Sequence, residues 1–463
     1  MKKIISLFFA VSIFMLCVGC TVSEPELEDP VPNPPEIENL FISELTAAQD
    51  TPSTCDKFLY AIVNTDIVNT EDLESIYGFL SAHKDAAVII VDASGFDSVQ
   101  SLYNAIKEDA LHRDGSTVGV QIFGTADMVP AFEISYAGYT QIWTGEFVVE
   151  EQEAILTDFF YSNFSNDPYI LDLSYSIMRH FDEGLDVQFM PEWPVARLPL
   201  RPGQYRAFFE KYSSFVQQSE LKTPDFVNFS NPIFPSHNSI DNFGVFMLRL
   251  DDEFGLINSD YRLYGNLKGD YPVEHPVLGD YETSNLQREN EAGCCEFIIN
   301  CHGNLNNIYS TIFVGGNEEQ PSFLSTENIN EVLKAKPYYL DTWACFNGKS
   351  MKSNLTTKAL NGMCVGMFSS TGIISNNGVN NRASLEEMKH CNFYYFYYNY
   401  FKALNEGESR AQAFSSAQKA YASSILEDAS LPLNGERNVQ FSLYNLLSYH
   451  NFGLIEVPPE ALP

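Results

Sequence analysis

Short apolar runs bounded by polar or glycine residues recur along the chain and predict the strands of a parallel sheet. Residues 86–92 (AAVIIVD) form one such run, which is typical of a strand buried on both faces. Residues 98–107 follow with the spacing of an amphipathic helix, and residues 118–124 (VGVQIFG) form the next apolar run. This β-α-β order predicts parallel strands joined by right-handed crossovers.

The pattern divides the chain into two halves. Residues 202–217 predict a helix with an aromatic face, which more often packs into a core than binds a cofactor, and residues 218–224 break that helix. We therefore expect a first subdomain over residues 46–224, a second over residues 225–457, and a tail at 458–463. In the second half we predict strands near 226–229, 298–300, 338–343 and 364–370, and helices near 384–404 and 409–425.

The beginning of the chain has the layout of a bacterial secretory signal. Lys2 and Lys3 precede an apolar run that is too short to span a bilayer comfortably, and we expect residues 1–19 to be removed. The residues before Cys20 resemble a lipobox, so we expect Cys20 to carry a lipid anchor; an ordinary signal peptide cut nearby is the alternative. Residues 20–45 are acidic and proline-rich, which predicts an extended tether.

These features predict where the protein resides. The tether resembles the acidic export tags of surface lipoproteins of Bacteroidota. We expect secretion through the Sec pathway and an outer-membrane lipoprotein on the periplasmic face or the cell surface, held to the membrane by its lipid anchor only.

Charge and composition exclude one class of partner. The 463 residues include 61 acidic and 27 basic side chains, and the formal net charge is −34, so we expect no nucleic-acid partner. Hydrophobic residues make up 45% of the chain, which predicts a well-filled globular core.

Two reactive side chains stand just beyond predicted strands. His302 follows the run at 298–300, and Cys345 follows the run at 338–343. A thiolate needs a neighbouring base, and imidazole titrates in a suitable range. The 43 residues between them allow a crossover, so the two strands could be parallel neighbours that end at one edge of the sheet. This arrangement predicts a cysteine hydrolase.

The cysteine count is compatible with a free nucleophile. Seven of the nine cysteines are left once Cys17 and Cys20 are assigned to the signal and the lipid, and an odd number leaves at least one thiol unpaired. Cys345 is the natural candidate. The alternatives are an inert buried thiol at Cys345 and a hydrogen-bonded strand-end histidine at His302.

The blocks around these residues, HG at 302–303 and ACFNG at 344–348, resemble the catalytic blocks of the gingipain-type cysteine peptidases in the caspase-like superfamily. The resemblance implies a caspase-like α/β/α sandwich with mostly parallel sheets in two side-by-side subdomains. Further blocks in the same order resemble that family at 121–130, 158–161, 194–198, 370–372 and 449–453, with Thr125 in place of an acid and Ala196 in place of a glycine.

The resemblance also implies roles for single residues. His302 would be the general acid or base, Cys345 the nucleophile, and the backbone amides of Gly303 and Cys345 the oxyanion hole. Ser370 and Thr371 would line the substrate site. Asp241 could pair with a basic P1 side chain, although a helix cap or surface acid is at least as common a use of aspartate.

One departure from the family leaves the function open. Residues 228–233 contain no carboxylate at the place where the family has a glutamate that supports the histidine. We expect a cell-envelope cysteine endopeptidase acting on protein or peptide substrates. A gingipain-type sortase with the same chemistry and a catalytically weak surface lipoprotein that binds a partner are the alternatives. We expect no cofactor; calcium stays open because family members can bind it, although no EF-hand loop is present.

Overall fold

The computed structural model describes part of the chain, and the description below is of that part. The described residues are 41–45, 56–83, 85–134, 155–164, 190–219, 226–230, 246–247, 249–250, 253–254, 262–265, 277–279, 282–294, 296–309, 312–314, 317–319, 322–349, 351–371, 384–386, 392–429 and 446–456. They belong to one compact unit that begins at Glu38. The predicted signal peptide, Cys20, most of the tether and the tail at 458–463 lie outside these residues.

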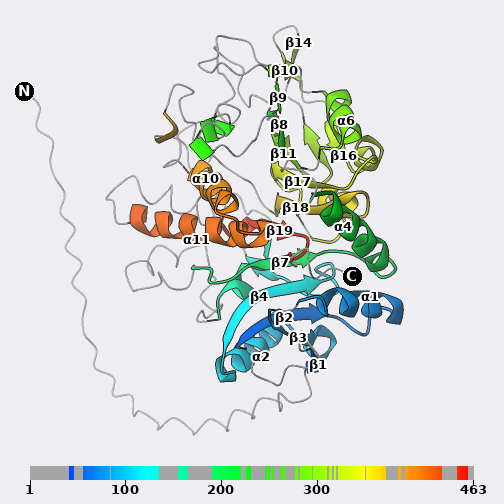
Figure 1. Ribbon diagram of the computed structural model, residues 1–463, viewed down its shortest axis with the longest axis vertical. Helices are drawn as coiled ribbons and strands as arrows, with labels where there is room; N and C mark the ends of the chain where they lie inside the picture. Colours follow the sequence, from blue (N-terminus) through cyan, green and yellow to red (C-terminus); the bar gives the residue numbers. More distant parts are fainter. Residues whose placement is uncertain are drawn as a thin grey trace, which may run out of the picture. The chain divides into compact units, whose positions relative to one another are not determined.

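A twelve-stranded sheet forms the centre of this unit (Figure 1). Its strands lie in the order β1-β3-β2-β4-β7-β19-β18-β17-β11-β8-β9-β10. Their bounds are β1 (Phe41–Leu45), β2 (Lys57–Val63), β3 (Ala87–Asp92), β4 (Ser116–Phe123), β7 (Val195–Leu198), β8 (Phe226–Ser230), β9 (Arg262–Gly265), β10 (Val277–Gly279), β11 (Glu296–Asn300), β17 (Tyr338–Trp343), β18 (Cys364–Ser370) and β19 (Tyr449–Phe452).

Most neighbouring strands are parallel, as the β-α-β pattern predicts. Parallel ladders join β3, β2, β4 and β7 in the first half and β18, β17, β11, β8, β9 and β10 in the second. The edge strand β1 is antiparallel to β3, and β19 is antiparallel to β18. This mixed α/β architecture confirms the predicted fold class.

Strand β19 joins the two halves. It pairs with β18 on one side and meets β7 at Phe452 and Arg197 on the other. The predicted boundary at residues 224 and 225 therefore separates two sets of strands that share one sheet. That boundary stays a prediction, because the sheet itself is continuous across it.

The alternation of side chains along the inner strands produces two hydrophobic cores. In β2, Tyr60 and Ile62 belong to the core on one face of the sheet, whereas Leu59 and Ala61 belong to the core on the other face. A strand with apolar residues at every position must be covered on both sides, which is the pattern of a parallel sheet between two helical layers.

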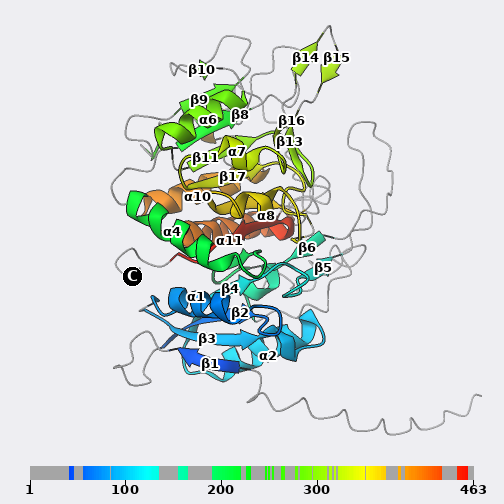
Figure 2. The same ribbon diagram turned by 90° about the vertical axis from the view of Figure 1, so that its right-hand side faces the viewer.

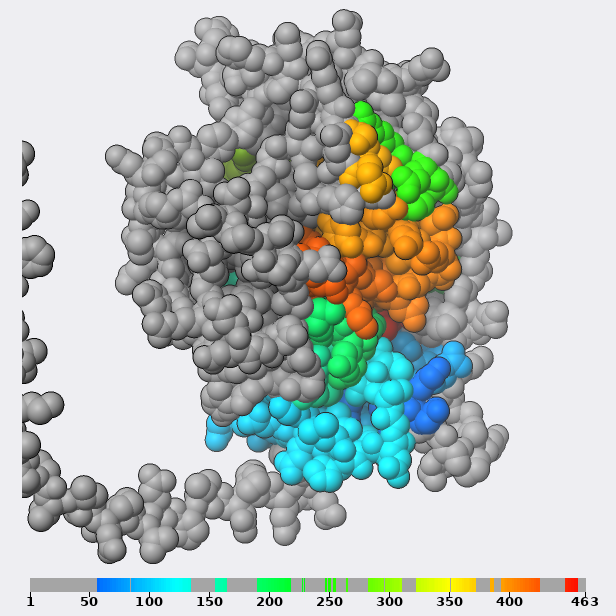
Figure 3. All heavy atoms as spheres, turned by 90° about the vertical axis from the view of Figure 1, so that its left-hand side faces the viewer, coloured from blue at the N-terminus to red at the C-terminus, as the bar shows by residue number. Residues whose placement is uncertain are grey.

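Helices cover both faces, and Figure 1 shows them on opposite sides of the sheet. One layer contains α1 (Thr70–Leu80), α4 (Tyr205–Ser219), α6 (Thr283–Ala292), α7 (Ile329–Val332) and α8 (Leu355–Leu360). The other contains α2 (Val99–His112), α10 (Asn392–Asn405) and α11 (Arg410–Ala429), and the orange residues of the last two lie together in Figure 3. None of the helices in the described ranges is both long and apolar enough to cross a bilayer.

Several short elements lie outside the main sheet. A three-stranded sheet consists of β12 (His302–Gly303), β13 (Asn307–Tyr309) and β16 (Ser322–Ser325), and a two-stranded sheet consists of β5 (Phe132–Ile134) and β6 (Ile155–Thr157). Figure 2 shows β13, β16, β5 and β6 on the same side of the unit. A second two-stranded sheet pairs β14 (Ile312–Val314) with β15 (Asn317–Glu319), and two 3₁₀ turns are η2 (Ala93–Gly95) and η3 (Phe159–Ser162).

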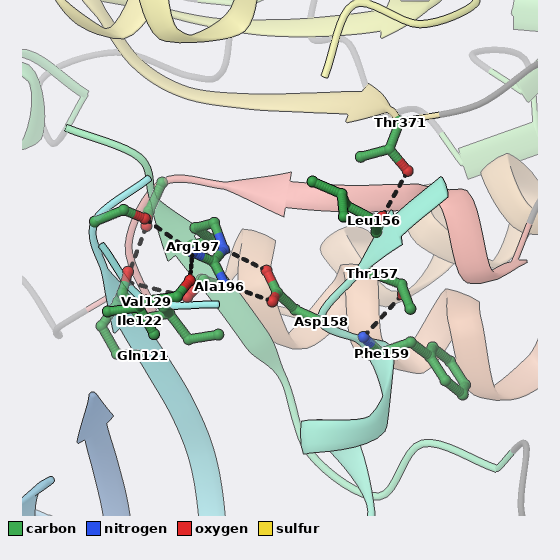
Figure 4. Close-up of polar contacts among 12 residues, drawn as sticks. Gln121, Ile122, Val129, Leu156, Thr157, Asp158, Phe159, Ala196, Arg197 and Thr371 are labelled. Atoms are coloured by element: carbon green, nitrogen blue, oxygen red, sulfur yellow. Dashed lines mark hydrogen bonds and ion pairs between the residues drawn. The ribbon is translucent and has the colours of Figure 1, made fainter. Parts of the chain in front are cut away.

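A buried ion pair ties together three blocks of the first half (Figure 4). Arg197 of β7 donates from Nε and Nη2 to the Asp158 carboxylate over 2.6 and 2.7 Å, and both side chains are buried. Its Nη1 donates to the carbonyls of Gly124 and Val129. The guanidinium thus holds the loop after β4, the strand β7 and the segment before η3 in one arrangement.

Candidate active site

The register of two parallel strands brings His302 and Cys345 to one edge of the sheet. Strand β11 pairs with β17 so that Asn300 lies opposite Trp343, and the Cys301 amide donates to the Trp343 carbonyl over 3.2 Å. Each reactive residue follows its strand by two positions. The predicted neighbouring placement of these two strands is confirmed, and both loops leave the carboxyl edge, where open α/β sheets bind their ligands.

Gly303 permits a close approach between the two loops. A Cβ at this position would lie 2.8 Å from the Cys345 carbonyl oxygen, 2.8 Å from the Ala344 Cβ and 3.0 Å from the Asn347 Nδ2. These distances are too short for a side chain. Glycine is therefore required for the hairpin that begins with His302 to pack directly against the backbone of Cys345.

The backbone turns sharply after Cys345. Phe346 has a φ of 60°, in the left-handed region that side-chain-bearing residues seldom occupy. The following turn is closed by a bond from the Lys349 amide to the Phe346 carbonyl. Non-glycine residues in this region concentrate at functional sites, where the surrounding packing holds a strained backbone in place.

Asn347 joins the loop of Cys345 to the hairpin of His302. Its buried side chain donates from Nδ2 to the carbonyls of Asn304 and Asn307, over 2.7 and 3.2 Å. Its own carbonyl accepts from the Thr356 hydroxyl at 3.0 Å, at the start of α8. In the sequence, Asn347 belongs to a block that resembles the family but has no predicted role. The structure makes it the connection between the two candidate catalytic loops.

Cys345 differs from the other described thiols in its exposure. None of the four described cysteines, Cys294, Cys301, Cys345 and Cys364, is in a disulfide, and Cys345 alone among these four is partly exposed. Burial raises the pKa of the Cys364 thiol to about 12, which makes that thiol a poor nucleophile at neutral pH. His302 and Gly303 are also partly exposed, so the two loops present the candidate catalytic groups to solvent.

The predicted substrate residues Ser370 and Thr371 lie in the interior. The Ser370 hydroxyl contacts the Ser448 hydroxyl at 3.1 Å, and the Thr371 hydroxyl donates to the Leu156 carbonyl at 2.8 Å (Figure 4). The Ser370 carbonyl also accepts from the Gly348 amide, two residues beyond Phe346. The Ser370 carbonyl thus links the end of β18 to the loop that follows Cys345, whereas the Thr371 hydroxyl binds the carbonyls of Leu156 and Ser448.

Other predicted features fall outside the described residues. Asp241 does so, and so does Asn231, beside which the supporting carboxylate was expected. Strand β8, which precedes that position, pairs with β11 so that Ser230 lies opposite Asn300. Within the described ranges no group of three or more His, Cys, Asp or Glu side chains is placed to hold a metal ion, so the calcium prediction has no candidate site there.

A buried carboxyl group lies in β17, the strand that leads to Cys345. Asp341 accepts at Oδ1 from the hydroxyls of Tyr397 and Tyr449, over 2.8 and 2.6 Å. Burial raises its pKa to about 7, and the two tyrosine hydroxyls offset only part of that rise. The sequence gives no sign of a special role for Asp341, because this residue stands within a largely apolar run whose pattern predicts only a strand.

Comparison with known proteins supports the fold. No family model matches the chain, and no curated protein matches it in sequence. Among solved structures, the crystal structure of the Arg-specific cysteine proteinase gingipain R is similar, with 10% identity, a TM-score of 0.54, and coverage of 88% of this chain and 79% of that one.

Two further solved structures agree. A structure titled only as a protease has 12% identity and a TM-score of 0.54, over 87% of this chain and 78% of that one. A complex of the pro- and mature domains of RgpB from Porphyromonas gingivalis has 10% identity and a TM-score of 0.52, over 85% and 78%. At these identities the likeness establishes a gingipain-like fold, and the function has to be argued from the site.

Proposed function

We propose that this protein is a cysteine endopeptidase in which Cys345 is the nucleophile and His302 the general acid and base. The observation that carries the proposal is the convergence of both residues at the carboxyl ends of adjacent parallel strands, with Gly303 packed against the Cys345 carbonyl. The gingipain-like fold supports it, because the similarity to the two solved protease structures covers most of the chain.

The reaction proceeds in two acyl-transfer steps. The Cys345 thiolate attacks the carbonyl carbon of a peptide bond, and the oxyanion is held by the backbone amides of Gly303 and Cys345. His302 then donates a proton to the leaving amine as the C–N bond breaks, which leaves a thioester on Cys345. Water, deprotonated by His302, attacks the thioester and releases the carboxylic acid and the thiol.

Asn347 has a positioning role in this reaction. Its side chain fixes the distance between the two loops through the Asn304 and Asn307 carbonyls. Geometry of this kind allows the thiol and the imidazole to act together without reorganisation during the reaction.

The decisive experiment compares peptide cleavage by the wild type with cleavage by Cys345→Ala and His302→Ala. A proteome-derived peptide library is incubated with each reduced protein, and new termini are identified by mass spectrometry. We expect cleavage by the wild type, with losses of at least about a thousandfold in either variant. Cys294→Ala, which removes a buried thiol elsewhere in the fold, should retain full activity.

Two results would contradict the proposal. One is the absence of amide cleavage by the wild type together with no reaction of Cys345 with an epoxide or acyloxymethyl-ketone probe. The other is equal cleavage by the wild type and Cys345→Ala. A product in which an added amine replaces the leaving group would identify transpeptidation by the same thioester instead of hydrolysis.

We propose further that the protein is a lipoprotein anchored through Cys20. The support is the sequence of the first twenty residues, which has the order of a lipoprotein signal. Labelling of cells with alkyne-tagged palmitate should tag the wild type and not Cys20→Ser. Equal labelling of the two proteins would contradict the anchor.

A further inference from the structure

A cavity opens at the same edge of the sheet and is lined by cations. It has a volume of about 300 Å³, and its charged lining residues are Arg201, Lys352 and Lys358. Asn306 and Thr326 are among its polar lining residues. Among the described residues that line it, none is an aspartate or glutamate.

This concentration of positive charge contrasts with the rest of the chain. Acidic residues outnumber basic ones by 61 to 27 over the whole sequence, yet no aspartate or glutamate occurs between Asp341 and Glu386. That stretch contains the nucleophile loop together with Lys349, Lys352 and Lys358. A local positive region in a strongly acidic protein attracts anionic groups that the remaining surface repels.

The cavity is built from the two candidate catalytic loops. Asn306 belongs to the hairpin that begins with His302, and Lys352 belongs to the loop that follows Cys345. A bond from the Leu355 amide to the Leu305 carbonyl, at 3.0 Å, joins these two segments beside the cavity. Arg201 comes from the segment after β7, so the first half of the sheet contributes the third cation.

The cations have few competing partners in the described structure. Arg201 has an ion pair with Asp127 at 3.6 Å, in which both side chains are well exposed to solvent. Exposed pairs of this length contribute little energy and exchange readily for another carboxylate. Lys352 and Lys358 are exposed and enter none of the ion pairs found among the described residues. Asp127, the partner of Arg201, also attracts Lys352 electrostatically and is the carboxylate that a substrate side chain would have to replace.

We propose that this cavity is a specificity subsite for an acidic side chain of the peptide substrate. The inference rests on the proposed peptidase function, because that function places a peptide against His302 and Cys345, on the two loops that form the cavity. An aspartate or glutamate at one fixed distance from the scissile bond enters the cavity and is held by the two lysines and Arg201. The polar amide and hydroxyl groups around them supply further hydrogen bonds to a carboxylate.

The first test measures binding without catalysis. A fluorescent capped peptide with three successive glutamates and its glutamine twin are titrated against the Cys345→Ala protein and against the same protein with Lys352→Glu and Lys358→Glu. We expect the glutamate peptide to bind at least tenfold more tightly than its twin, and charge reversal to abolish that preference. Lys334→Glu with Lys336→Glu is the matched control, since these exposed lysines precede β17 at the opposite end of the strand.

The second test uses cleavage. In a peptide library, the wild type should favour Asp or Glu at one position relative to the scissile bond, and Lys352→Glu with Lys358→Glu should reduce that preference at least tenfold. Equal binding of the two peptides with cleavage indifferent to acidic residues overturns the subsite and leaves the peptidase proposal intact. Absence of cleavage with preserved glutamate-specific binding refutes the peptidase proposal and supports the anion site. The subsite is also overturned if Lys352→Glu with Lys358→Glu leaves the affinity for both peptides unchanged. Binding of inorganic sulfate with no preference for the glutamate peptide over its glutamine twin overturns it as well.

Discussion

The buried Asp341 carboxyl should make the stability of the protein fall as the pH rises. Its pKa is about 7 in the folded protein because of burial, against an ordinary value of 3.8. Between these values the folded state keeps the proton and the unfolded state releases it, so the folded state binds more protons and loses stability with increasing pH. The difference between the two pKa values lowers the free energy of unfolding by on the order of 4 kcal/mol above pH 7. This destabilisation vanishes below about pH 4.

Asp341→Asn tests this reasoning because an amide preserves the acceptor for both tyrosine hydroxyls and does not titrate. We expect the free energy of unfolding of the variant, relative to the wild type, to rise by roughly 3 kcal/mol between pH 5 and pH 8. Urea denaturation can be followed by the fluorescence of Trp343, whose ring stacks on Tyr397 at 5.3 Å.

A comparison of variant with wild type removes the effects of other titrating groups. Burial lowers the pKa of both His83 and His450 to about 4, so these side chains favour the folded state as the pH rises from about 4 to 6.5, which is opposite in sign. Both proteins contain the two histidines, so their contributions cancel in the difference between the two free energies of unfolding. Asp66→Asn, at an exposed site, should show no pH-dependent difference. A difference for Asp341→Asn that is constant with pH, or that grows as the pH falls, would refute the reasoning.

Three further substitutions test the packing of the site and its support. Arg197→Met leaves the buried Asp158 carboxylate without its partner and should lower the free energy of unfolding by about 3–5 kcal/mol, as measured by urea denaturation. Arg201→Met, which removes an exposed ion pair, should lower it by less than about 1 kcal/mol. Similar losses in the two variants would contradict this reasoning. Gly303→Ala should lower the free energy of unfolding by about 1–3 kcal/mol through overpacking. Gly78→Ala, where the added methyl group meets no atom within 4 Å, should not lower it. Equal stability of the two variants would be evidence against the close approach of the two loops at Gly303. Asn347→Ala should lower the free energy of unfolding by about 1–3 kcal/mol and reduce kcat more than it changes KM, which steady-state kinetics would reveal; a pure KM effect would argue against a positioning role.

Much of the fold follows from patterns that the sequence displays openly. The strands predicted at 86–92 and 118–124 correspond to β3 and β4, and the helix predicted at 98–107 corresponds to α2, which begins after the capping side chain of Ser98. These predictions succeed because a buried parallel strand is mostly apolar and an amphipathic helix has a regular period. The end of α2 at His112 lies five residues beyond the predicted end, since apolar periodicity does not determine where a helix stops.

Other features depend on contacts between distant segments and were not predictable. Strand β19 joins the halves because the chain returns to the sheet after two helices, and no local pattern encodes that return. The cavity beside the loop that follows Cys345 requires Arg201 from one half and Lys352 from the other. In the sequence alone, neither Arg201 nor Lys352 can be distinguished from an ordinary surface cation.

The register of β11 against β17 explains how two short blocks can define a site in a chain with so little sequence likeness to its structural neighbours. Once Asn300 lies opposite Trp343, the residues that follow the two strands must meet, whatever side chains fill the remainder of the sheet. A slip of one position would send the side chains of β17 to the opposite faces and bury polar Thr342 in a different core. The apolar side chains of both strands oppose such a slip, because each face already packs against a helical layer. The core residues thus position His302 and Cys345 by specifying register, and many different apolar sequences can meet that requirement. The register of the strands does not determine the cations around the neighbouring cavity. The proposed specificity for an acidic side chain therefore has to be argued from the structure.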